Sequence, residues 1–196
     1  NFKYLFLSYI SSDLTGGSEN QNELNFRNWR FGFAGSNGYG YKLCKSAIIL
    51  YSSYSYDWTQ VDFTDTADNE LDQITMDRFE DGIRFGTSND GGLKIVATSL
   101  ISLDVNYQRS IVFERHLFWK WAGSAVIEAV ANGLLDVFIK EIFQSSPQAG
   151  PIVNFLLKNA LAYGIYELRQ GEMNWPFSST PPLSFDSFRF GVAFTF

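Results

Sequence analysis

The chain has little of several features that define common protein classes. Cys44 is the only cysteine among 196 residues, which excludes a scaffold held together by disulfides. Charged residues make up 18% of the chain, whereas they form about a quarter of an ordinary soluble domain. No run of about 18 uncharged apolar residues is present, so the sequence predicts no conventional transmembrane helix.

Positive charge is also scarce. The net charge is −6 and no polybasic tract occurs, which excludes a nucleic-acid partner and attachment to an anionic membrane surface through basic side chains. The chain starts at Asn1 without an initiator methionine or a signal peptide. This is the form expected of an exported protein after removal of its signal peptide, although a trimmed chain would have the same form. We expect no cofactor.

Aromatic side chains, in contrast, are abundant. The chain has 19 Phe, 10 Tyr and 5 Trp, together 17% of its residues, which excludes intrinsic disorder. The clearest pattern is at the C-terminus, where every second side chain from 188 to 196 is large and apolar. These residues are Phe188, Phe190, Val192, Phe194 and Phe196. A period of two predicts a strand with one strongly apolar face, which would be core in a soluble sheet and lipid-facing in an outer-membrane barrel.

The same alternation recurs along most of the chain, at 29–34, 48–58, 79–86 and 93–107. The last segment is longer than the usual strand of about 5–6 residues, and it suits a tilted membrane span of about 9–11 residues plus its ends. Two short polar stretches, 36–38 and 89–92, contain the Asn-Gly and Gly-Gly pairs typical of hairpin turns. We therefore predict antiparallel hairpins.

Two segments, 117–143 and 152–169, have helical spacing instead. The polar residues of the first are four apart, so they wind around the helix and leave no single wet face. The helices must therefore be covered, and five large residues are expected to contact a partner: Phe118, Trp121, Leu134, Phe138 and Phe155. The predicted fold is mainly β. It is a single domain, 1–196, forming a small antiparallel transmembrane β-barrel of about eight strands, with an α-helical hairpin inserted at about 117–169 before the last strand.

The terminal strand resembles the closing strand of bacterial outer-membrane β-barrel proteins. In that family a C-terminal Phe, preceded by alternating apolar residues, is recognised by the assembly machinery. The resemblance implies that Phe188, Phe190, Val192, Phe194 and Phe196 form such a signal. It also implies a location in the bacterial outer membrane, with the lipid bilayer, lipopolysaccharide, the assembly machinery and other envelope proteins as partners. A soluble β-protein with an apolar last strand is the alternative.

Further aromatic residues suit the girdles that outer-membrane barrels place at the two membrane surfaces. The candidates are Tyr39, Tyr41, Tyr54, Tyr56, Trp58 and Tyr107. Ordinary packing within a sheet would also use such residues.

Few residues suggest chemistry. His116, the only histidine, is a weak catalytic candidate, because Ser110, Ser124 and Asp104 lie near it in sequence but no nucleophile motif surrounds any of them. Nine carboxylates fall within 57–81. Asp62, Asp65, Asp68 and Glu70 are weak candidates for a metal site, since the Asp-x-Asp-x-Asp-Gly order of a calcium loop is missing. A solvated loop is the favoured interpretation of this acidic stretch.

Three function classes follow from these features: a structural anchor or subunit of a larger envelope complex, a lipid-modifying barrel enzyme using His116, and a pore. A barrel of about eight strands is filled by its own side chains, which disfavours a porin. The uncovered helices favour the first class. A soluble lipid-binding β-barrel carrier is the leading alternative outside the membrane.

Overall fold

The structure is a computed structural model that describes residues 1–11, 26–64, 70–80 and 82–194. Strands dominate, as the alternation predicts, and two long helices separate the last strand from the others. The elements in chain order are β1 (Phe2–Ser11), β2 (Phe26–Leu43), β3 (Ser46–Phe63), α1 (Glu70–Asp77), β4 (Ile83–Val96), β5 (Ile101–Val112), α2 (Phe118–Ser145), α3 (Gly150–Gly171) and β6 (Leu183–Phe194).

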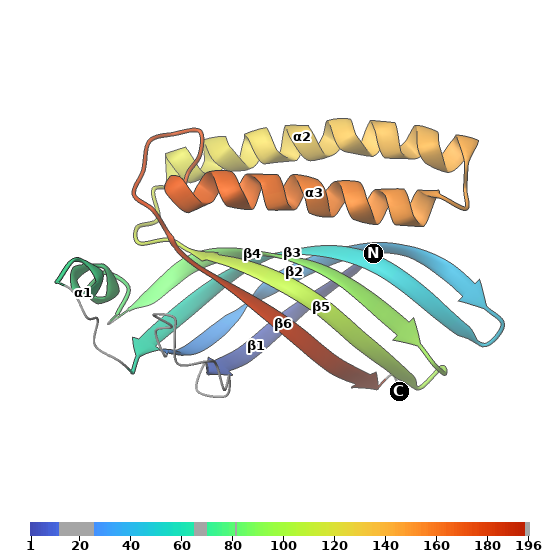
Figure 1. Ribbon diagram of the computed structural model, residues 1–196, viewed down its shortest axis with the longest axis horizontal. Coiled ribbons are helices and arrows are strands. Elements are labelled where there is room, and N and C mark those ends of the chain that lie inside the picture. Colours follow the sequence, from blue (N-terminus) through green and yellow to red (C-terminus); the bar gives the residue numbers. More distant parts are fainter. Residues whose placement is uncertain (12–25, 65–69, 81, 195–196) are drawn as a thin grey trace.

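The six strands form one antiparallel sheet in the order β1-β2-β3-β4-β5-β6, so strands adjacent in sequence are adjacent in space. The sheet curls, and α2 and α3 lie side by side along one of its faces (Figure 1). The predicted count of about eight strands is wrong for the described residues because β2 and β3 have 18 residues each and use far more of the chain than usual. The described strands do not form a closed barrel, since β1 and β6 each pair with only one neighbour.

Both predicted hairpin turns are wrong. Residues 36–38 lie inside β2 and residues 89–92 lie inside β4. The chain turns instead beside Cys44, which has a φ of 53°, and again at 97–100, inside the segment predicted as one long strand.

The glycines of the two mispredicted turns have a packing role in the sheet. A Cβ atom on Gly92 would lie 2.4 Å from the Tyr51 ring, and one on Gly38 would lie 2.7 Å from Cβ of Tyr51. Both glycines therefore make room for Tyr51 between three strands and do not reverse the chain direction.

One face of the sheet is polar and buried. Arg30 on β2 hydrogen-bonds to side chains on β3, β4 and β5, and its guanidinium lies 5.8 Å from the Phe6 ring of β1 and 5.6 Å from the Phe185 ring of β6. One side chain can contact all five other strands only when the sheet wraps around it. This polar face is therefore the concave face.

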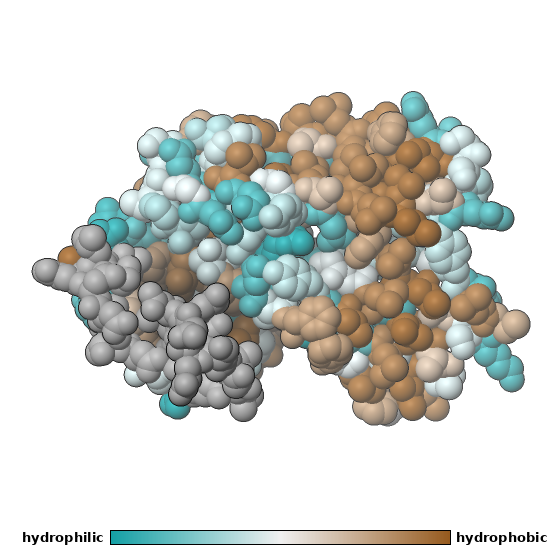
Figure 2. Space-filling model, in the orientation of Figure 1, coloured by the Kyte–Doolittle hydropathy of each residue, from teal (hydrophilic) through white to brown (hydrophobic). Residues whose placement is uncertain are grey.

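The convex face is apolar, and much of it is exposed. Phe190 on β6 is 76% exposed and Leu5 on β1 is 84% exposed. Their exposed neighbours on this face include Leu7, Trp29, Phe31, Phe33, Leu103, Phe188, Val192 and Phe194. Figure 2 shows a band of hydrophobic side chains that runs from the two helices to the C-terminal end of β6. A soluble sheet has the opposite arrangement, with apolar side chains inside and polar ones outside.

The two helices occur close to where the spacing predicts them, at 118–145 against the predicted 117–143 and at 150–171 against 152–169. They pack on the convex face over the middle of the sheet. Trp121 of α2 lies 5.5 Å from the Phe85 ring and 5.9 Å from the Tyr56 ring, measured between ring centroids. The sheet therefore covers one side of the helical hairpin.

The tight curl predicts a strong effect of a small change at Gly32. A Cβ atom there would lie 2.2 Å from the backbone oxygen of Tyr56, whereas a Cβ atom on Gly35 would meet nothing within 4 Å. We expect Gly32→Ala to lower the free energy of unfolding by about 1–3 kcal/mol through overpacking. Gly35→Ala, three residues along the same strand, is the matched control and should change it by less than about 0.5 kcal/mol. Urea unfolding followed by tryptophan fluorescence measures both, and equal effects would contradict this account of the curl.

Candidate functional site

Four of the five residues of the predicted assembly signal lie on the convex face of β6, and Phe196 lies outside the described residues. Their exposed fractions are 60% for Phe188, 76% for Phe190, 57% for Val192 and 62% for Phe194. The strand thus presents the apolar face that the alternation predicts, and that face is not packed against the rest of the described chain.

The six predicted girdle aromatics do not form one group. Four of them face the helical hairpin: Tyr39 packs on Phe143, the Tyr41 hydroxyl donates to the Gln148 carbonyl, Tyr54 lines a cavity beneath the helices, and Tyr56 packs on Trp121. The other two pack within the sheet. Trp58 stacks on Phe31, and the Tyr107 hydroxyl donates to Asp186.

His116 is surrounded by aromatic rings. Its imidazole stacks on Phe85 at 4.5 Å between ring centroids and packs against Trp121. The candidates near it in sequence are bonded elsewhere. Ser110 accepts from Arg30, Ser124 accepts from Arg169, and Asp104 accepts from Tyr51. These three candidates therefore do not form a nucleophile and base with His116.

The acidic stretch divides into different environments. Asp57 is buried on the concave face and paired with Arg30, so it does not belong to a solvated loop. Asp62 is exposed at the end of β3 and Glu70 begins the short helix α1, while Asp65 and Asp68 lie outside the described residues. Among the residues that the structure describes, no group of three or more acidic, histidine or cysteine side chains could hold a metal ion.

The helix residues predicted to contact a partner differ in their exposure to solvent. Phe118, Leu134 and Phe138 are at least half exposed, at 52%, 70% and 52%. Trp121 packs on the sheet, and Phe155 is half-buried.

The strongest polar cluster centres on Arg30 in the concave face. Nη2 lies 2.8 Å from Oδ2 of Asp57 and 2.7 Å from Oγ of Ser88, and Nη1 lies 2.8 Å from Oε1 of Gln108 and 3.0 Å from Oγ of Ser110. The Arg30 and Asp57 side chains are 0% and 2% exposed. Because a buried charge is tolerated only when it is paired and hydrogen-bonded, this cluster fixes the interior of the curl. It also fills the concave face at this level.

A second set of polar side chains lies between the helices. Arg169 of α3 is 2% exposed and pairs with Glu128 at 3.0 Å, and it donates to Ser124 at 2.9 Å. Lys158 of α3 pairs with Asp136 at 2.7 Å and donates to Oδ1 of Asn132 at 3.1 Å. Four of the polar residues spaced four apart on α2 therefore contact α3, namely Ser124, Glu128, Asn132 and Asp136. Apolar residues of the same helix, such as Leu134, stay exposed.

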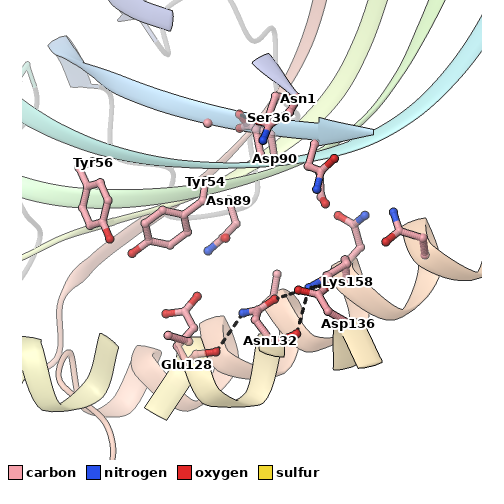
Figure 3. Close-up of a pocket in the computed structure, with 18 of the residues that line it drawn as sticks. Asn1, Ser36, Tyr54, Tyr56, Asn89, Asp90, Glu128, Asn132, Asp136 and Lys158 are labelled. Atoms are coloured by element: carbon pink, nitrogen blue, oxygen red, sulfur yellow. Dashed lines mark hydrogen bonds and ion pairs between the residues drawn. The ribbon is translucent and has the colours of Figure 1, made fainter. Parts of the chain in front are cut away.

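These groups border a cavity of about 390 Å³ between the hairpin and the convex face (Figure 3). Tyr54, Tyr56 and Asn89 line it from the sheet. Glu128, Asn132 and Asp136 line it from α2, and Asn154, Lys158 and Asn159 line it from α3. The sequence does not predict this cavity; the four-residue spacing of polar residues along α2 is the feature that points to a polar space beside the helix.

By length and composition alone, α2 is also able to cross a membrane. The helix Phe118–Ser145 has 28 residues and a window with mean hydropathy 1.5, of which 11% is buried. The sequence predicts no such segment because the run of apolar residues is not free of charge. Glu128 and Asp136 interrupt that run, and both are paired with cations of α3.

Comparison of the chain with protein-family models, with curated proteins and with solved structures finds no match. The observations that bear on function are therefore the polar concave face of the sheet, its apolar convex face and the buried polar clusters.

Proposed function

We propose that this chain belongs to an integral outer-membrane β-barrel that serves as a structural anchor or subunit of a larger envelope complex. The observation that carries the proposal is the inverted polarity of the sheet. Its concave face buries Arg30 and Asp57, whereas Phe190 on its convex face is 76% exposed. Transmembrane barrels have this arrangement, with polar residues inside and an apolar band outside.

Water is a poor environment for the convex face. Large apolar side chains are exposed over several strands and both helices. Typical soluble monomers rarely expose contiguous apolar patches larger than a few hundred Å². Removing apolar surface from water stabilises a protein by about 25 cal/mol per Å², and surface that stays in water does not contribute this free energy. A lipid environment removes this cost and supports the proposal.

A membrane location also sets a requirement for the sheet edges. Unpaired backbone groups are not tolerated against hydrocarbon, so the edges of β1 and β6 must be joined to each other or through further strands. The two strands run in opposite directions in the meander, which permits antiparallel pairing between them. The proposed protein is thus a closed barrel with the Arg30 cluster inside.

The helical hairpin supports the anchor role. Val130, Leu134 and Val137 of α2 are 58%, 70% and 62% exposed. The two acidic residues in the middle of the same helix, Glu128 and Asp136, are paired with cations of α3. The hydrophobic band in Figure 2 runs without a break from the helices to the strands. We infer that hairpin and strands share one apolar environment, in which the hairpin offers additional surface to lipid or to a partner subunit.

The alternatives receive less support. A lipid carrier needs an apolar interior, but the concave face holds Arg30, Asp57 and Gln108. An open pore is opposed by the Arg30 side chain, which is 0% exposed in the middle of the concave face. In the lipid-modifying enzyme His116 would be the catalytic residue, but it packs on the Phe85 and Trp121 rings, and among the described residues no hydrogen bond joins it to a nucleophile or a second base.

Membrane extraction tests the proposal. We expect the chain to stay with the outer-membrane fraction after alkaline carbonate treatment and to require detergent for release. As a closed barrel it should migrate faster in gels before boiling than after boiling. Native electrophoresis of the detergent extract then reports whether the chain travels within a larger assembly. Release in buffer without detergent would refute the membrane location, and migration as a lone chain would refute the subunit role.

A further inference from the structure

We propose that the concave face of the sheet, beside the Arg30 cluster, holds a binding site for a small zwitterion, an α-amino acid with an apolar side chain. A pocket of about 510 Å³ lies there, a volume within the usual range for small-molecule sites. The inference concerns the inside of the curl, so it does not depend on whether lipid or protein covers the outside.

The pocket lies next to the Arg30 cluster along the strands. Gln108 of β5 binds Arg30, and Asn106 is two residues away on the same strand, so it shares the concave face. Asp90 of β4 is directly opposite Gln108 in the sheet. Arg189 of β6 is directly opposite Asn106. Three adjacent strands therefore bring an acid, an amide and a guanidinium to the lining of this pocket.

Three buried polar atoms of these residues have no hydrogen-bond partner among the described residues. They are Oδ1 of Asp90, Oδ1 of Asn106 and Nη2 of Arg189. Nη2 of Arg189 lies 4.0 Å from Oδ1 of Asp90, which is close enough for an ion pair but too long for a hydrogen bond. Asp90 is only 6% exposed, and a buried charge without a close partner is costly. A bound molecule that both donates and accepts hydrogen bonds would satisfy all three atoms.

A further cation lines the same pocket. Lys94 of β4 lies opposite Asp104 of β5 in the sheet. Asp104 instead accepts from the Tyr51 hydroxyl at 2.6 Å and from the Asn106 amide at 2.8 Å. Within the part of the chain that the structure describes, Lys94 has no ion-pair partner. Its ammonium group is therefore available to an anionic group of a ligand.

Both signs of charge in the lining favour a zwitterion. The ammonium group of an α-amino acid would donate to Oδ1 of Asp90 and to Oδ1 of Asn106. Its carboxylate would accept from Arg189 and Lys94, and hydrogen bonds between charged groups are the strong ones. An anion alone would lie close to Asp90, and a cation alone would lie close to Arg189, so each would also meet a like charge.

The rest of the lining determines the kind of amino acid. The Phe2 and Tyr4 rings, which stack with centroids 5.7 Å apart, line the pocket from β1, and Ile49 lines it from β3. These surfaces suit an apolar or aromatic ligand side chain. The Arg189 side chain is 36% exposed, so it is able to move aside when a ligand enters between it and Asp90.

Titrations followed by saturation-transfer NMR on the full chain in detergent test the inference, with protein-free micelles as the blank. The probes are leucine and phenylalanine. Each is compared with the amine that lacks its carboxylate (3-methylbutylamine or phenethylamine) and with the acid that lacks its ammonium group (4-methylpentanoate or 3-phenylpropanoate). We expect at least one amino acid to bind at least about ten-fold more tightly than either of its two halves. If neither amino acid binds, water alone fills the pocket, and if a half binds as tightly as its amino acid, only one charge is recognised; either result would overturn the assignment.

Variants locate the binding. Asp90→Asn keeps the size of the side chain but removes its charge, and it should weaken binding of the amino acid at least about ten-fold. Lys94→Met removes the unpaired cation and should also weaken binding; it decides the matter if Asp90→Asn fails to fold by circular dichroism. Lys45→Met, the same change at an exposed lysine in the turn between β2 and β3, is the matched control and should bind as the original chain does. Unchanged binding in a folded Asp90→Asn or Lys94→Met variant would refute this site.

Discussion

Replacing Arg30 with methionine is expected to lower the free energy of unfolding by about 3–5 kcal/mol, because it leaves Asp57 buried without its cation. The two side chains are 2.8 Å apart and nearly inaccessible to solvent. The change also removes the donor for Ser88, Ser110 and Gln108, which come from two further strands. Urea unfolding of the detergent-solubilised chain, followed by tryptophan fluorescence, measures the loss.

Two further variants separate charge from geometry at this position. Arg30→Lys keeps the charge but lacks the planar fork that reaches three strands at once, so it should recover only part of the stability. Arg115→Met removes an exposed arginine and should change the free energy of unfolding by less than about 0.5 kcal/mol. If Arg30→Met unfolds at the same urea concentration as Arg115→Met, the Arg30 cluster does not hold the curl together.

The alternation of residues predicts the strands and which face each side chain takes. It does not identify Arg30 as the centre of the fold. The sequence places the partner Asp57, 27 residues away, in an acidic stretch interpreted as a solvated loop, and Gln108 is 78 residues away. Only the register of β2 on β3, which sets Arg30 opposite Thr59 and Gly32 opposite Asp57, brings these groups into reach. Side-chain pairing across strands is thus information that a single period of two does not contain.

The turns and the helices show two further features that the sequence alone does not predict. Asn-Gly and Gly-Gly are strong turn signals, but glycine is also required where a large neighbouring ring needs space, as Tyr51 does beside Gly92. Sequence alone does not distinguish these two needs. In α2, the polar spacing of four predicts a line of polar residues that winds around a covered helix. In the structure Glu128 and Asp136 both pair with α3, and apolar residues such as Leu134 stay exposed. The cations that neutralise Glu128 and Asp136 come from α3, so the polar cavity follows only from how the two helices pack.

Replacing Phe190 with arginine distinguishes lipid from water at the convex face. Phe190 is 76% exposed, so in water its replacement would disturb little packing and should change the free energy of unfolding by less than about 0.5 kcal/mol. Facing the middle of a bilayer, an arginine costs about 2–4 kcal/mol. We therefore expect Phe190→Arg to be destabilised by about 2–4 kcal/mol when the chain is reconstituted into phosphatidylcholine vesicles and unfolded with urea.

The matched control for Phe190→Arg introduces an arginine outside the apolar band. Ser99 is exposed in the turn between β4 and β5, where the strands end, so Ser99→Arg adds the same charge at a position that the proposal leaves in water. Its free energy of unfolding should stay within about 0.5 kcal/mol of the original value. If Phe190→Arg and Ser99→Arg unfold at the same urea concentration, the exposed apolar face of β6 does not lie against lipid. The inverted polarity of the sheet would then require a protein partner to cover it, because Phe188, Phe190 and Phe194 are 60%, 76% and 62% exposed in the described chain.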